Sequence, residues 1–221
     1  MRLARKIEFR RFVTKMLNKR CGLADKTACR SGRGKQAHLN LPMGVSMIPE
    51  EHALRQLFHQ TVSECYAEHL GIHDSEVTSY VADLLTEFCV VENLYLIRDA
   101  QGLPVKEVGQ MLAASDPVHG TAPSFDAERK VRKHIGDYAL FSTGMYPEAV
   151  QRAKFAGDAS FLEMVRTGKE SYYIVSQFNL FEYQNEAPFF GRLSEEFESY
   201  MYGLTKVRGE LDRMGAPVHL M

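Results

Sequence analysis

The sequence has no long hydrophobic run. Its most apolar stretch, residues 88–97, is interrupted by Glu92 and Asn93. That stretch is about half the length that a membrane-spanning helix needs. No apolar core follows the basic start of the chain, so nothing resembles a secretory signal. The pattern therefore predicts a soluble protein.

Short motifs that mark common enzymes are also missing from the sequence. It contains no GxGxxG after a predicted strand, no GxxxxGK[ST] phosphate loop, no GxSxG elbow and no HExxH. No CxxC pair occurs among the four cysteines, Cys21, Cys29, Cys65 and Cys89. A reducing cytoplasm is therefore the expected location, and no cofactor is predicted.

What the sequence does have is a sharp division of charge. The first 40 residues carry twelve Lys and Arg against two acids, a formal +10, whereas the rest of the chain carries a formal −11. The net charge of −1 hides both segments. Residues 1–20 fit one basic amphipathic helix, and residues 21–40 show no periodicity.

Four interpretations of residues 1–42 stay open. The segment could be an organelle transit peptide, a helix on an anionic membrane surface, or a nucleic-acid contact. It could also be an upstream extension of a native chain that starts at Met43 or Met47. We favour the last interpretation, because helix caps and most aromatics begin after Met47. The acidic remainder is a poor surface for polyanions.

The body of the chain, residues 47–216, repeats apolar residues at helical spacing and predicts an all-α, single-domain bundle of six to eight helices. Pro49, Glu50 and Glu51 suit a first turn, and Asp74 suits an N-cap. Segment 171–178 has strand propensity but no visible partner strand, so we expect a helix there. The expected helices cover residues 49–71, 74–97, 104–112, 125–143, from 147, 161–178 with an interruption near Gly168, and 190–214.

The last expected helix is long and carries a heptad-like seam. Such a seam forms either a dimeric coiled coil or the core of an antiparallel bundle. The bundle is favoured because three seam residues are aromatic. Under the coiled-coil alternative, a protein partner or a second copy would bind through four seam residues, Phe190, Phe197, Tyr200 and Leu204.

The leading candidate site is His134, Asp137 and Tyr138, which share one side of a predicted helix. An imidazole, an acid and a phenol could transfer protons or bind a polar ligand. Polar residues beside a close helix contact also commonly hold its register, and this structural interpretation is favoured. The close contact is predicted from a stripe of small residues, Gly136, Ala139 and Thr143.

The sequence predicts no metal site. Asp83 and Glu87 lie one helical turn apart, near Tyr80, but a di-iron bundle needs Glu-x-x-His twice. None of the eight histidines has Glu three residues before it, so an exposed acidic face is expected. No zinc ligand set is expected from His52, His59, His69 and His73.

The run from His134 to Glu148, HIGDYALFSTGMYPE, resembles a segment of an uncharacterised family of bacterial all-helical proteins. The similarity begins near Glu50 and includes YVADLL at 80–85 and Asn93–Tyr95. It implies a helical fold and no activity. We expect a non-enzymatic accessory or interaction protein. Two alternatives remain: a ligand-binding or enzymatic bundle near His134, and nucleic-acid or membrane binding through residues 1–20.

Overall fold

The computed structural model describes residues 48–49, 51–99, 101–115, 124–153, 160–179 and 181–215. The basic helix predicted over residues 1–20 lies outside these ranges. So do the other predictions for residues 1–42, and residues 116–123, which separate the helices expected over 104–112 and 125–143.

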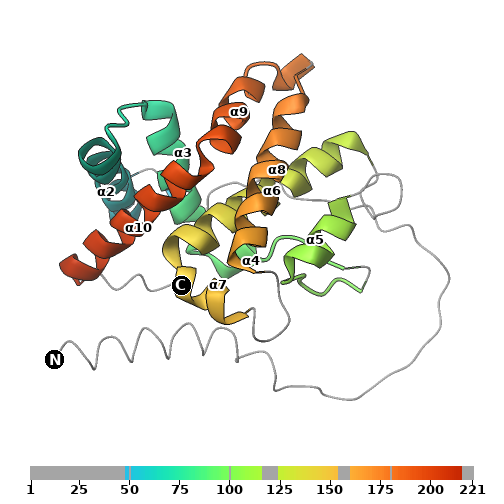
Figure 1. Ribbon diagram of the computed structural model, residues 1–221, viewed down its shortest axis with the longest axis horizontal. Coiled ribbons are helices and arrows are strands. Elements are labelled where there is room, and N and C mark those ends of the chain that lie inside the picture. The colour runs from blue at the N-terminus through green and yellow to red at the C-terminus, as the bar shows by residue number, and fades with distance from the viewer. Residues whose placement is uncertain are drawn as a thin grey trace. The chain divides into compact units, whose positions relative to one another are not determined.

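All regular elements within these ranges are helices, and an isolated bridge joins Arg98 to Pro104. The predicted all-α fold is therefore confirmed. Nine α-helices and one short 3-10 helix follow one another in the described ranges (Figure 1): α2 (Ala53–Leu70), α3 (Ser75–Phe88), α4 (Val91–Leu94), α5 (Val108–Ser115), α6 (Phe125–Met145), α7 (Pro147–Ala153), α8 (Phe161–Gln177), η2 (Phe181–Tyr183), α9 (Ala187–Glu195) and α10 (Phe197–Met214).

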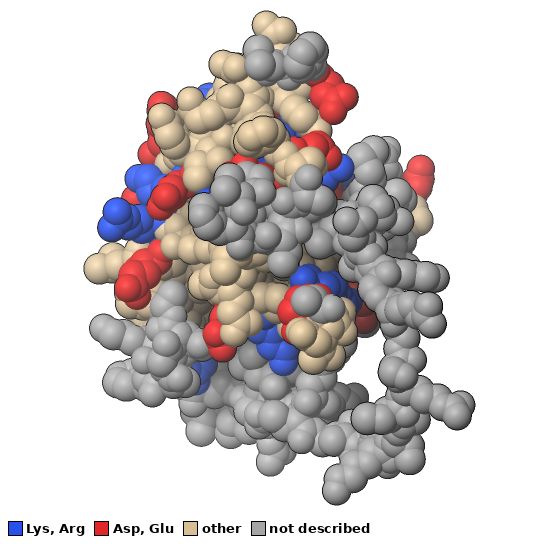
Figure 2. Space-filling view, turned by 90° about the vertical axis from the view of Figure 1, so that its right-hand side faces the viewer, with Lys and Arg blue, Asp and Glu red and all other residues tan. Residues whose placement is uncertain are grey.

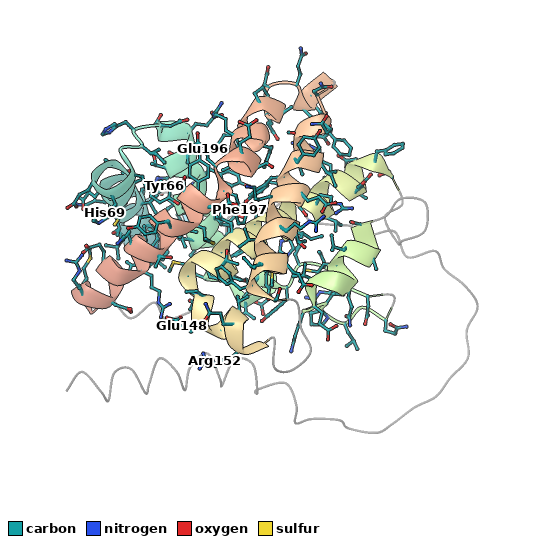
Figure 3. The ribbon with its side chains drawn as sticks, in the orientation of Figure 1. Tyr66, His69, Glu148, Arg152, Glu196 and Phe197 are labelled. Atoms are coloured by element: carbon teal, nitrogen blue, oxygen red, sulfur yellow. The ribbon has the colours of Figure 1, made fainter. Side chains whose placement is uncertain are left out.

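Helix α6 lies at the centre of the bundle and contacts most of the other helices. Helices α5, α7, α8 and α10 all pack against it, and α8 crosses it while α9 packs beside α8 (Figure 1). Helices α2 and α3 form a pair joined by a short turn, in which α2 packs against α10 and α3 contacts α6. Tyr66 on α2 and Phe197 on α10 both lie inside the bundle, whereas Glu148 and Arg152 lie on α7 at its edge (Figure 3).

Helix caps set the ends of α2 and α3. The carboxylate of Asp74 accepts from the backbone N–H of Glu76 at 2.9 Å, which confirms the predicted N-cap of α3. Helix α2 begins at Ala53, later than predicted, because the His52 side chain accepts from the N–H of Leu54. It ends at Gly71, which adopts a left-handed conformation with φ 66°.

Three other predicted boundaries were wrong. The helix expected over 74–97 ends at Phe88, where the Asn93 side chain donates to the carbonyl of Glu87 and terminates α3. Helix α8 continues through Gly168, because the Phe197 ring packs directly on this glycine. Helix α6 continues through Gly144 in the same way, because Leu204 packs on it. A small residue at a close helix contact therefore does not end the helix.

The single long helix predicted over residues 190–214 was also wrong. It is divided at Glu196 (φ −102°, ψ 23°) into α9 and α10. This break and the separate α4 raise the number of α-helices above the predicted six to eight. The seam residues between Phe190 and Leu211 are buried, which agrees with the bundle-core interpretation, whereas Met214 at the end of α10 is exposed. The four residues that would bind a partner under the coiled-coil alternative, Phe190, Phe197, Tyr200 and Leu204, are 2%, 0%, 3% and 0% exposed, so a partner cannot contact them on this fold.

One face of the molecule is mixed in charge. On the face that Figure 2 shows, Lys and Arg side chains lie interspersed with Asp and Glu side chains. Nucleic-acid binding typically uses a continuous basic patch or stripe instead. A search of the described helices for a stretch long and apolar enough to cross a membrane finds none.

Candidate functional site

The predicted site on α6 is centred on Asp137, whose side chain is buried. Its Oδ1 accepts hydrogen bonds from the hydroxyls of Tyr80 at 2.5 Å and Tyr172 at 2.8 Å. Its Oδ2 accepts from Lys133 Nζ at 2.9 Å. We call these four residues the Asp137 cluster. Because they come from α3, α6 and α8, the cluster ties three helices together.

Electrostatics keep the donors of the cluster protonated. Burial, followed by the charge of Asp137, raises the pKa of Tyr80 and Tyr172 well above the ordinary value for a phenol. Burial alone would lower the pKa of Lys133, but Asp137 and Glu87 outweigh it and the pKa is raised. The hydroxyls and the ammonium group therefore remain donors at neutral pH, which suits a structural tie better than proton transfer.

His134 lies beside this cluster in closed surroundings. Its ring is 6% exposed and packs edge-on against Phe88, with 5.8 Å between the ring centroids. Burial lowers its pKa to about 4, against the opposing effect of Asp137 and of a hydrogen bond with the backbone of Leu94. The imidazole is therefore neutral near pH 7, and its Nε2 is buried without a hydrogen-bond partner.

His134 and Asp137 lie close together on α6, as predicted from their spacing. The phenols that bind Asp137, however, are not the one predicted from the sequence. Tyr138 is partly buried and packs against the hydrophobic core. The phenols that bind Asp137 belong to Tyr80 and Tyr172, on two other helices. Spacing within one helix reveals only neighbours on that helix. The sequence pointed to Tyr172 only indirectly. The stripe of small residues predicted that another helix packs closely on α6, but not which residue of that helix binds Asp137.

The second predicted set, Asp83 and Glu87, does not form a metal site with its neighbours. Asp83 Oδ1 lies 2.8 Å from Arg55 Nη2 and 3.1 Å from His59 Nε2, so it ties α3 to α2. Glu87 is partly buried, and burial raises its pKa. Across the described residues, no group of three or more His, Cys, Asp and Glu could hold a metal ion. The face differs from the exposed acidic face expected, because Asp83 is ion-paired and Glu87 is partly buried.

The four clustered histidines serve separate purposes in the structure. His52 caps α2, and His59 contacts Asp83. His69 lies in the last turn of α2, as its position in the sequence suggested. His73 lies in the turn that follows and is exposed. His52 and His69 thus lie at the ends of α2, His59 joins α2 to α3, and His73 is a surface residue.

A feature that the sequence reasoning missed is an exposed stripe on α8. Leu162 is 78% exposed and Tyr173 is 57% exposed, although both are large apolar side chains. Arg166 and Glu170, also exposed, lie between them on the same side of the helix. We call these four residues the α8 stripe. The signal was present in the sequence, because Leu162 and Tyr173 stand three helical turns apart with charged residues between them.

The α8 stripe borders a surface groove. Its residues share the groove with Val165 and Lys169 of α8, and the opposite side is formed by Ser194 and Glu198. The ammonium group of Lys169 contacts both carboxylate oxygens of Glu198, at 2.8 and 2.9 Å. A second groove lies at the C-terminal end of α8, and its lining includes Ser176, Asn179 and Arg192. Neither groove is lined by His134 or Asp137.

No protein-family model, curated protein sequence or solved structure matches this chain. The resemblance to bacterial all-helical proteins therefore stays a prediction.

Proposed function

We propose that this protein is a non-enzymatic interaction protein, which binds another protein through the α8 stripe. The observation that carries the proposal is the exposure of Leu162 and Tyr173 on one face of a well-packed helix, on the border of a groove. Single exposed apolar residues are ordinary. Two on one helix face, with charges between them, have the pattern by which helical surfaces recognise partners.

The Asp137 cluster supports the same proposal. Both oxygens of its carboxylate already accept hydrogen bonds from within the chain. The neighbouring His134 is neutral and enclosed by Phe88 and the Leu94 backbone. A general acid–base pair needs groups that can reach a substrate and change protonation near the working pH. The arrangement at Asp137 favours a structural role over the enzymatic alternative.

The residues of the α8 stripe have different roles in the proposed contact. Leu162 and Tyr173 supply the apolar area that a partner removes from water. Arg166 and Glu170 supply charges of both signs, which set the orientation of the partner. As part of the same proposal we place the protein in the cytoplasm, because Cys65 and Cys89 are free, buried thiols.

Site-specific photocrosslinking tests the proposal. A benzophenone amino acid is placed at Leu162 in one variant and at Tyr173 in another, in the full chain in its native cells. Both positions are exposed, so the replacement leaves the core intact. We expect discrete protein adducts after irradiation at both positions, identified by mass spectrometry.

The matched control places the same amino acid at Gln56, which is exposed on α2. This variant should give few adducts, because α2 carries no part of the α8 stripe. Equal crosslinking at Gln56, or no adduct at either α8 position, contradicts the proposed function.

A further inference from the structure

We propose that the protein bound at the α8 stripe is a second copy of this chain, in a two-fold symmetric dimer whose two α8 helices run antiparallel. This inference rests on the proposed function and adds the identity of the partner. It differs from the seam dimer considered from the sequence, since the seam is buried and the α8 stripe is exposed.

The charges of the α8 stripe are arranged for such a pair. Arg166 and Glu170 stand two residues before and two residues after Gly168, about 3 Å along the helix axis in each direction. A two-fold axis at the level of Gly168 therefore places Arg166 opposite Glu170 of the second copy, twice. Both side chains are exposed, and no ion pair to either is found among the described residues.

The apolar residues match under the same axis. Leu162 stands six residues before Gly168 and Tyr173 five residues after it, about 9 Å and about 7.5 Å along the helix. Leu162 of one copy therefore faces Tyr173 of the other to within about 1.5 Å along the helix axis. One symmetry operation thus covers both exposed apolar residues and pairs both free charges.

The charges also select the direction of the helices. A parallel pair in register would bring Arg166 against Arg166 and Glu170 against Glu170, which is repulsive. Lys169 adds little repulsion in the antiparallel pair, because Glu198 of its own chain already holds it. The antiparallel arrangement is therefore the one that the α8 stripe favours.

Charge reversal tests the geometry directly. Arg166→Glu and Glu170→Arg each place like charges opposite each other twice, so each variant alone should dimerise roughly tenfold more weakly than the native chain. An equimolar mixture of the two variants restores both opposite-charge pairs, so it should form a heterodimer. The double variant R166E/E170R should also regain the dimer. Sedimentation equilibrium of the full chain measures the homodimers, and native mass spectrometry identifies the heterodimer by mass.

Folding is checked by circular dichroism, and both replaced side chains are exposed, so the variants are expected to melt as the native chain does. A native chain that stays monomeric at high concentration overturns the dimer. So does a mixture that fails to associate while the native chain dimerises. If crosslinks at Leu162 then contain only other proteins, the proposed function stands and the second-copy inference alone has failed.

Discussion

The ring of Tyr172 lies against the backbone of Gly136, so closely that a Cβ at position 136 would come within 2.6 Å of two ring carbons. This approach of α8 to α6 lets the Tyr172 hydroxyl reach Asp137 at 2.8 Å. Gly136 and Asp137 therefore have complementary roles. The glycine allows α8 to approach α6 closely, and the hydrogen bond from Tyr172 to the Asp137 carboxylate fixes the position of α8 on α6.

Removing the carboxylate should cost stability. Asp137→Ala leaves two buried phenol hydroxyls and Lys133 without their acceptor, so we expect the free energy of unfolding to fall by about 3–5 kcal/mol. Tyr172→Phe removes one donor and should cost about 1.5–3 kcal/mol. Tyr173→Phe, at an exposed neighbour, should change stability by less than about 0.5 kcal/mol. Urea unfolding curves measure all three.

The stability of the variants distinguishes a structural role of Asp137 from a role in ligand binding or catalysis. Tyr80 and Tyr172 share the same oxygen of Asp137, so a double-mutant cycle between Tyr80→Phe and Tyr172→Phe should show a coupling of about 0.5–3 kcal/mol. An Asp137→Ala variant that is as stable as the native chain, yet has lost ligand binding, would instead support a functional site.

Two glycines on α10 should respond in opposite ways to replacement by alanine. A Cβ at Gly203 would lie 2.7 Å from Cζ of the buried Tyr66, whose hydroxyl is fixed on the carbonyl of Tyr200. Gly203→Ala should therefore cost about 1–3 kcal/mol through overpacking. Gly209 has open space around it on the same helix, so Gly209→Ala should add about 1 kcal/mol. Thermal melting of both variants gives the comparison, and a shift in the same direction would contradict the packing of α2 on α10.

Features of this fold could be predicted from the sequence when the interacting residues are close together along the chain. Asp74 caps α3 by accepting from an N–H only two residues away, so this cap was predicted from the sequence. The spacing of apolar residues within one helix indicates which of its faces is buried, so most of the core was also predicted. The break at Glu196 was not, because the heptad spacing continues across it unchanged. Where a helix bends depends on what packs against it.

The candidate site shows the same limit. The pairing of His134 with Asp137 on one helix followed from their spacing of three residues. The Tyr172 contact joins positions 35 apart in the sequence, so it required the packing of α8 on α6. The α8 stripe was not predicted, because an apolar residue at helical spacing is ordinarily expected on the buried face of its helix. Met164 and Val165 form that face, and Leu162 points away from it.

Arg129 should be more important for stability than an ordinary surface arginine. It is 5% exposed, its guanidinium lies 3.8 Å from the Tyr183 ring centroid, and its Nη2 lies 2.5 Å from Glu186. Arg129→Ala should cost about 2 kcal/mol, since it removes the stacking and a charged hydrogen bond while the half-exposed Glu186 can still be hydrated. Arg213→Ala, at a 72% exposed side chain, is the matched control and should be nearly neutral. Equal unfolding midpoints for the two variants would contradict the role assigned to Arg129.

His134 should give the protein a specific sensitivity to acid. Burial lowers its pKa from 6.5 to about 4 in the folded state, so between these values the unfolded chain binds a proton that the folded chain does not. Stability is therefore undiminished above about pH 6.5 and is lost as the pH falls towards about 4, by about 3 kcal/mol in total.

His134→Leu removes this titration and keeps an apolar side chain against Phe88, so its stability should vary less with pH over that interval than the native stability does. The difference between the two pH profiles isolates His134, because acidic groups with shifted pKa values, such as Glu87 and Glu148, contribute to both. His73→Leu, at an exposed position, should leave the native profile unchanged. If His134→Leu and the native chain lose stability in parallel between pH 6.5 and 4, the imidazole is already solvated in the folded state and the closed surroundings assigned to it are wrong.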